Sequence, residues 1–155
     1  MAAFEYRQAE EIRDAFTRHG VKYLFIGKSG AILLGYPDTT QDADIYVLKD
    51  PLNGEAIVRS LRELGFDISE IERAEIVRGK DFIQLKNGPF DLDLIYAPDG
   101  IEQFEDAWNR RVVIEGFNVC HIDDIIASKR AANRAKDRDS LDRLESFRRY
   151  LASNP

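Results

Sequence analysis

Hydrophobic and polar positions along this chain follow patterns whose period changes repeatedly, and each change indicates a new element. In residues 4–19 the apolar positions recur at helical spacing, and Gly20 follows at a natural C-terminal position, so we predict a helix. Residues 21–26 form a short apolar run rich in β-forming residues. The glycine-containing turn 27–30 and the apolar residues 31–34 follow, which predicts a strand, a tight turn and a short helix.

Two later segments, 42–47 and 90–96, alternate strictly between apolar and polar residues, as a strand with one buried face does. Each segment carries an Asp-x-Asp pattern on its polar face. The four aspartates are Asp42, Asp44, Asp91 and Asp93. The sequence therefore predicts two strands that each present a pair of carboxylates on one side.

The rest of the chain completes an α+β fold with a small mixed sheet and helices packed on it. We expect a helix over 53–64 with Asn53 as its N-cap, a helical turn over 68–77, a strand over 82–85, a short helix ending near 109, a hairpin at 115–116, and helices from about 123 and 139. These elements are expected to form one domain over residues 1–155, with C-terminal helices (about 123–151) packed on it.

The composition limits the chemistry. With 155 residues, 44% of them hydrophobic, the chain is long enough to bury one core. One cysteine and two histidines exclude an internal disulfide and a zinc site rich in these residues, so any metal must be held by oxygen. The sequence contains neither a signal-like start nor an apolar run long enough to span a membrane, so we expect a cytoplasmic protein without a membrane partner.

Charge is unevenly distributed along the chain. The net charge is −6, yet residues 129–149 carry eight basic and four acidic residues, a net charge of +4. This segment is either a surface that meets phosphate groups or a solvated helix carrying charge pairs. Both interpretations remain open from the sequence.

The paired aspartates are candidate metal ligands. Two carboxylates at positions i and i+2 of a strand lie about 7 Å apart at their Cα atoms, close enough to share metal ions. A second pair on a neighbouring strand would complete a cage. The alternative is that both strands simply turn polar residues toward water, although aspartate is depleted in strands.

Two further features are typical of phosphate binding. Gly27-Lys28-Ser29 lacks the P-loop spacing, because Lys22 stands where that motif needs glycine, but such a turn still presents free backbone N–H groups and the Ser29 hydroxyl. Its glycines also suit close packing alone. Lys129 continues the apolar stripe of the predicted helix after Ile122, so its ammonium either reaches water or faces an anion.

The order of these parts resembles the nucleotidyltransferase superfamily, over roughly residues 21–145. The stretch YLFIGKSGAILLGYPDTTQDADIYV is similar to the hG(G/S)…GYPR-T-DhDhhV region of the minimal nucleotidyltransferases grouped with AbiEii-type toxins. DLDLIYAPDGIEQFEDAWNRR is similar to their third-carboxylate strand and following helix, and HIDDIIASKRAANRAKDRDSLDRL to their closing helices. The resemblance implies the nucleotidyltransferase (polymerase-beta-like) fold.

The resemblance also implies roles for individual residues. Asp42, Asp44 and Asp93 match the three catalytic carboxylates, which hold two Mg²⁺ or Mn²⁺ ions, and Asp91 is the alternative to Asp93. The nucleotide-binding positions are Gly27, Lys28, Ser29, Lys129 and Lys136.

The implied activity is metal-dependent transfer of a nucleoside monophosphate from an NTP to a hydroxyl of RNA, protein or a small molecule. The basic C-terminal helices favour tRNA or another RNA as the acceptor, and the AbiEii-like resemblance implies a toxin–antitoxin system with a protein partner encoded nearby. Two residues depart from the pattern: Lys28 replaces a small residue, and Asp38 stands where relatives carry arginine. A degenerate homologue that binds a nucleotide or a partner protein without catalysis is the alternative.

Overall fold

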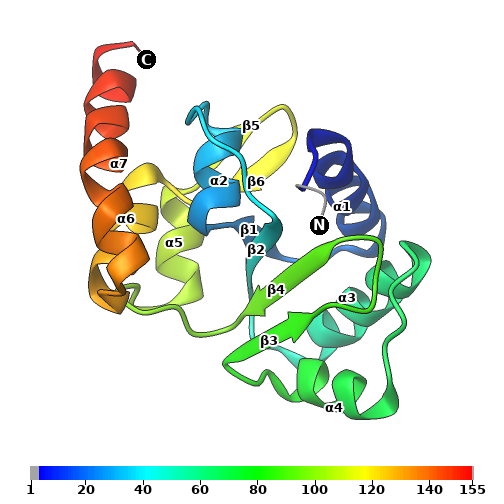
Figure 1. Cartoon of the computed structure of the whole chain (residues 1–155). Coiled ribbons are helices and arrows are strands. Elements are labelled where there is room, and N and C mark those ends of the chain that lie inside the picture. The colour runs from blue at the N-terminus through cyan, green and yellow to red at the C-terminus, as the bar shows by residue number, and fades with distance from the viewer. Residues whose placement is uncertain (1–3, 155) are drawn as a thin grey trace.

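The sheet at the centre of the molecule has six strands in the order β3-β4-β2-β1-β6-β5 (Figure 1). The computed structural model describes residues 4–154 apart from the side chain of Lys136. The strands are β1 (Tyr23–Phe25), β2 (Asp42–Val47), β3 (Phe82–Leu85), β4 (Asp91–Ile95), β5 (Val112–Ile114) and β6 (Phe117–Val119). β2 pairs with β4, and β1 with β6, in parallel, whereas the other neighbours are antiparallel. The predicted α+β class with a mixed sheet is confirmed.

Seven helices surround this sheet in the described residues. They are α1 (Tyr6–His19), α2 (Gly27–Leu33), α3 (Pro51–Glu63), α4 (Glu70–Arg78), α5 (Phe104–Arg110), α6 (Ile122–Ala132) and α7 (Ala135–Ser153). α1 ends at Gly20 in the left-handed conformation, as predicted. α4 is a complete helix, since Ser69 and Glu72 form a capping box at its start.

Two predicted helix starts are wrong. The cap of α3 is Asp50, whose carboxylate accepts hydrogen bonds from the backbone N–H groups of Leu52 and Asn53, because Pro51 occupies the first helical position. Asn53 is instead buried and bonds the backbone of Lys22 and Leu48, which ties α3 to the sheet. α7 begins at Ala135, four residues before the predicted start near Asp139.

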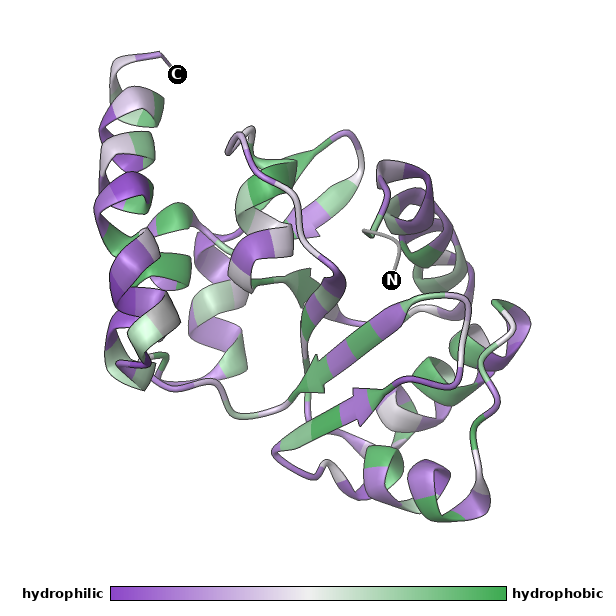
Figure 2. Ribbon diagram, viewed as in Figure 1, coloured by the Kyte–Doolittle hydropathy of each residue, from purple (hydrophilic) through white to green (hydrophobic). Residues whose placement is uncertain are grey.

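Hydrophobic residues form two clusters that include residues of the sheet, and Figure 2 shows hydrophobic and hydrophilic positions alternating along the strands. Ala43, Ile45 and Val47 of β2 join one cluster, as their alternation predicts. Tyr46, on the same side as the aspartates, is also buried, because Phe104 of α5 packs edge-on against its ring at 5.0 Å. The polar face of β2 is therefore confined to its first half. No helix within residues 4–154 has the length and apolar character needed to span a membrane.

The parallel register of β2 and β4 decides where the site lies. Asp42 is opposite Asp91, and Asp44 is opposite Asp93. Residues in register on parallel neighbours point to the same side of the sheet, so the two Asp-x-Asp patterns meet. α2 follows β1 directly, and its first residue, Gly27, approaches Asp44.

Candidate active site

Three aspartates of the sheet line one cavity of about 390 Å³, which Asp137 and Asp139 of α7 also line. The three of the sheet are Asp42 and Asp44 of β2 and Asp93 of β4, and we refer to them as the carboxylate wall. Asp91, the alternative third carboxylate, is not among the residues that line this cavity. Strand register thus brings together the three residues matched to the catalytic carboxylates.

Two carboxyl groups of the carboxylate wall have raised pKa values. Burial, followed by the negative charge of Asp93, raises the pKa of Asp44, and burial together with the charge of Asp42 raises the pKa of Asp93. Each of these two carboxyl groups influences the pKa of the other, so they resist ionising together. Neighbouring carboxylates that resist ionisation together form a site where an added cation is favoured.

The start of α2 fixes the position of Asp44. The Ser29 hydroxyl accepts a hydrogen bond from the backbone N–H of Asp44 at 3.0 Å and donates one to the carbonyl of Ile26 at 3.1 Å. Gly27 lies so close that a Cβ atom there would stand 2.6 Å from Asp44 Oδ2, and its φ of +63° favours glycine. Ser29, matched to a phosphate-binding residue, is buried in this structure and positions the strand.

Four cations face the carboxylates across the cavity, and we call them the cationic wall. They are Lys28 of α2, Lys129 of α6, Arg134 at the start of α7 and Arg143 of α7. Two of these, Arg134 and Arg143, were not identified from the sequence as site residues. The side chain of Lys136, predicted to bind nucleotide, lies outside the described residues.

The two departures from the family pattern contact each other. Lys28 Nζ lies 3.2 Å from Asp38 Oδ2, and Arg143 Nη2 lies 3.8 Å from the same oxygen. A hydrogen bond from the backbone N–H of Thr39, aided by Lys28, lowers the pKa of Asp38, so this carboxyl group stays ionised. Asp38 therefore holds two cations at the rim of the cavity.

Another carboxylate, which is buried, holds the other two cations. Asp137 is 1% exposed and contacts Lys129 Nζ at 3.5 Å and Arg134 Nε at 2.7 Å. Burial disfavours its charge, but the hydrogen bond from Arg134 and the charge of Lys129 lower its pKa overall. Lys129 thus has the anionic partner that its place on an apolar stripe requires. The sequence signal for Asp137 was available, because it is an acid three residues after Arg134.

The residues fit a divalent metal by their chemistry. Among residues 4–154, no three His, Cys, Asp or Glu side chains form a preassembled metal cluster. The oxygen-only donor set nevertheless suits Mg²⁺ or Mn²⁺, and the raised pKa values of Asp44 and Asp93 mark a site that lacks compensating positive charge. Metal ligation by Asp42, Asp44 and Asp93 remains a prediction.

Comparison with solved structures identifies the architecture. The chain is similar to the lincosamide antibiotic adenylyltransferase LnuA, solved with lincomycin bound, at a TM-score of 0.67 and 14% identity, with 94% of this chain and 99% of that chain covered. It is also similar to a candidate nucleotidyltransferase from Thermotoga maritima, at a TM-score of 0.52 and 16% identity, covering 96% and 92%. No family model and no curated protein matches the sequence. The chain has the nucleotidyltransferase fold.

Proposed function

We propose that this protein is a metal-dependent nucleotidyltransferase that transfers a nucleoside monophosphate from an NTP to a hydroxyl acceptor. The observation that carries the proposal is the single cavity in which Asp42, Asp44 and Asp93 face Lys28 and Lys129. Carboxylates that attract divalent cations stand on one side, and cations that suit a polyphosphate stand on the other. The fold shared with LnuA supports the same activity.

The residues divide the work of the reaction. Asp42, Asp44 and Asp93 would hold two Mg²⁺ or Mn²⁺ ions, which neutralise the carboxylates and stabilise negative charge on the transferred phosphoryl group. The acceptor oxygen forms a bond to the α-phosphorus while the bond from that phosphorus to the β-phosphate oxygen breaks, and pyrophosphate leaves. Asp93 would hold the metal ion nearest the attacking oxygen and would accept the proton of the acceptor hydroxyl.

The cationic wall offsets charge on the leaving pyrophosphate. Lys129 is half-buried and anchored by Asp137, so little conformational freedom is lost when it contacts a phosphate. Lys28 and Arg143 stand at the rim, where Asp38 holds them in place. Gly27 admits the close contact between the start of α2 and Asp44.

A small molecule is the acceptor class that the surface charge favours. Several cations of the basic C-terminal segment are paired with acids: Arg130 and Arg148 with Glu145, and Arg134 with Asp137. This is the pattern of a solvated helix carrying charge pairs, which leaves less positive charge for RNA. LnuA, the structural neighbour, is an adenylyltransferase of lincosamide antibiotics, which are small molecules. The RNA acceptor, the protein partner, the toxin–antitoxin role and the cytoplasmic location remain predictions from the sequence.

The test combines binding and transfer. We expect Mg²⁺ or Mn²⁺ with an NTP to raise the melting temperature, since a ligand at 100 times its Kd adds about 2.7 kcal/mol to the unfolding free energy. Asp42→Asn should abolish this shift. It should also abolish transfer of a nucleoside monophosphate, labelled at its α-phosphorus, to a panel of hydroxyl-bearing small molecules and RNA. A shift without transfer to any acceptor supports the non-catalytic homologue. No shift with any of the four NTPs contradicts the proposal.

A further inference from the structure

A second cavity adjoins the site along α7. It has a volume of about 610 Å³ and lies between the loop that follows α2 and one face of α7. Tyr36 and Pro37 line it from the loop, and Arg143, Phe147 and Tyr150 line it from the helix. Its volume is that of an ordinary small-molecule site. Arg143 lines both this cavity and the catalytic one, so the two are neighbours.

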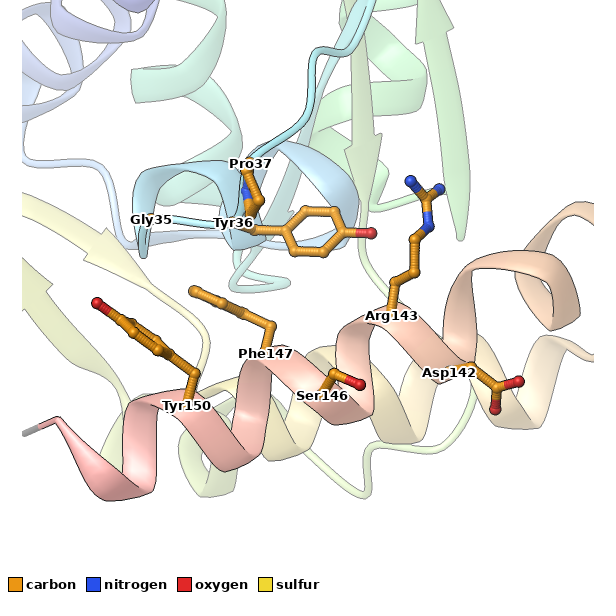
Figure 3. Close-up of a pocket in the computed structure, with 8 residues that line it drawn as sticks. All are labelled: Gly35, Tyr36, Pro37, Asp142, Arg143, Ser146, Phe147 and Tyr150. Atoms are coloured by element: carbon orange, nitrogen blue, oxygen red, sulfur yellow. The ribbon is translucent and has the colours of Figure 1, made fainter.

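Aromatic rings form the body of this cavity. The Tyr36 ring meets Phe147 edge-on at 5.5 Å, and the rings of Phe147 and Tyr150 are nearly parallel at 6.3 Å. Figure 3 shows Tyr36 lying across Phe147 with its hydroxyl toward Arg143, and Tyr150 farther along the same helix face. Tyr150 is 59% exposed, so a large aromatic face remains open to a ligand.

Polar groups stand beside the rings. Tyr36 is 6% exposed, and its hydroxyl is buried without a hydrogen-bond partner. A buried hydroxyl without a partner is costly, and a ligand that supplies one removes that cost. The Arg143 guanidinium reaches toward the same place (Figure 3) and adds positive charge at the end of the cavity nearest the catalytic site.

We propose that this aromatic cavity binds the base of a purine nucleoside triphosphate. The inference rests on the proposed function and extends it to the identity of the nucleotide. Arg143 joins the aromatic rings to the cationic wall, so a ligand with phosphates on that wall has its planar group within reach of the rings. From Arg143 to Tyr150 the helix rises about 10 Å at 1.5 Å per residue, a distance that a ribose and its base span together.

The position of the cavity favours the nucleotide over the acceptor. The acceptor oxygen must approach Asp93, and the catalytic cavity is bounded on that side by Phe82 and Gln84 of β3, in the strand that pairs with β4. The aromatic cavity contains no residue of β3 and adjoins the catalytic cavity at Arg143, one of the cations that would meet the phosphates. A purine presents a larger face for stacking than a pyrimidine, so ATP and GTP are expected to bind more tightly than CTP and UTP.

The experiment separates the base from the phosphates. Equilibrium binding is measured with Mg²⁺ and ATP, and separately with Mg²⁺ and inorganic tripolyphosphate, which has no base. Tyr150→Ala should weaken ATP binding about tenfold and leave tripolyphosphate binding unchanged, because stacking on one ring is lost. Tyr36→Phe should weaken ATP alone, by a smaller factor. Tyr6→Ala is the matched control, since Tyr6 is a 50% exposed tyrosine on α1.

Each other outcome overturns the inference. If Tyr150→Ala leaves ATP binding unchanged, the base lies elsewhere. If ATP and tripolyphosphate weaken equally, the ring affects the cationic wall rather than a base. If the unmutated protein binds CTP or UTP as tightly as ATP and GTP, the cavity does not take a purine. Failure of the protein to bind either ATP or tripolyphosphate contradicts the proposed function itself, which distinguishes that result from the others.

Discussion

The two walls of the candidate active site are held in place by different forces. The carboxylate wall is held by backbone pairing. The register of β2 against β4 places Asp44 opposite Asp93 without any contribution from side-chain contacts. The cationic wall is held by side-chain ion pairs to two acids, Asp38 and Asp137. A wall fixed by the backbone tolerates unfavourable charge, as the raised pKa values of Asp44 and Asp93 indicate. A wall fixed by ion pairs depends on charge for its shape, so the two should respond differently to substitution.

Removing one carboxylate should have the largest effect. Asp93→Asn keeps the size of the side chain but removes the proposed metal ligand and proton acceptor. We expect transfer to fall by more than about 1,000-fold, the equivalent of about 4 kcal/mol in the transition state. Asp91→Asn is the matched control on the same strand, because Asp91 does not line the cavity. Initial rates of nucleoside monophosphate transfer are compared in the two variants. An equal loss of activity in both would contradict the choice of Asp93 as the third carboxylate.

Substitution of Gly27 tests the close contact between the start of α2 and Asp44. Gly27→Ala places a Cβ atom 2.6 Å from Asp44 Oδ2 at a φ of +63°, so either the start of α2 or the carboxylate must move. We expect the unfolding free energy to fall by about 1–3 kcal/mol and transfer to fall about 100-fold, since a small displacement of a catalytic group is costly.

Urea unfolding and transfer rates measure the two effects of Gly27→Ala separately. Gly20→Ala is a control for the backbone effect alone, because Gly20 also has a positive φ but no atom lies within 4 Å of the added Cβ. Full activity in Gly27→Ala would show that the close approach is unnecessary.

The strands of the carboxylate wall were predictable because strict alternation fixes which residues share a face. For that reason the two aspartates of each pair, Asp42 with Asp44 and Asp91 with Asp93, were predicted to lie on one face of their strand. β2 begins and ends at the predicted residues. Pairing between the strands, which singles out Asp93 as a neighbour of Asp44, depends on long-range contacts that no local pattern contains. The burial of Tyr46 was missed for the same reason, since α5 covers it from a distant part of the chain.

The cationic wall was mostly beyond sequence reasoning. Lys28 and Asp38 were identified separately as departures from the family pattern. Their contact with each other could be found only from the fold. Arg143 is one of several arginines on α7, and nothing in its local sequence distinguishes it from those that face solvent. Lys129 was recognised because a lysine interrupts an apolar stripe, which is a periodic signal like that of the strands.

The Lys28–Asp38 pair offers a milder test of the cationic wall. Lys28→Ala removes a cation from the rim and should weaken tripolyphosphate binding about tenfold. Asp38→Asn frees Lys28 and Arg143 from their shared carboxylate and should strengthen binding by a smaller factor, about threefold, because both groups are partly exposed.

The double variant of the same pair measures coupling between the two residues. If Asp38 acts through Lys28, the gain from Asp38→Asn should shrink when Lys28 is already absent. Dissociation constants for tripolyphosphate, measured by titration in the presence of Mg²⁺, are needed for the unmutated protein, the two single variants and the double variant. Strictly additive effects would indicate that Asp38 acts through Arg143 alone.

The last prediction concerns the pH dependence of stability, which distinguishes the two walls most directly. Asp44 and Asp93 have raised pKa values in the folded protein, so the native state binds more protons than the unfolded chain at pH values above the ordinary carboxyl range. The unfolding free energy should therefore fall, by about 1.4 kcal/mol for each unit by which these pKa values are raised, as the pH rises from that range toward neutrality. Asp38 and Asp137 have lowered pKa values, so their contribution is complete above the unfolded pKa and is lost only in acid. Urea unfolding in chelator across this range measures the slope, which should flatten in Asp44→Asn and on addition of Mg²⁺. A slope unchanged in Asp44→Asn would mean that the carboxylates of this wall do not repel one another, and a cation between them would then lack an electrostatic driving force.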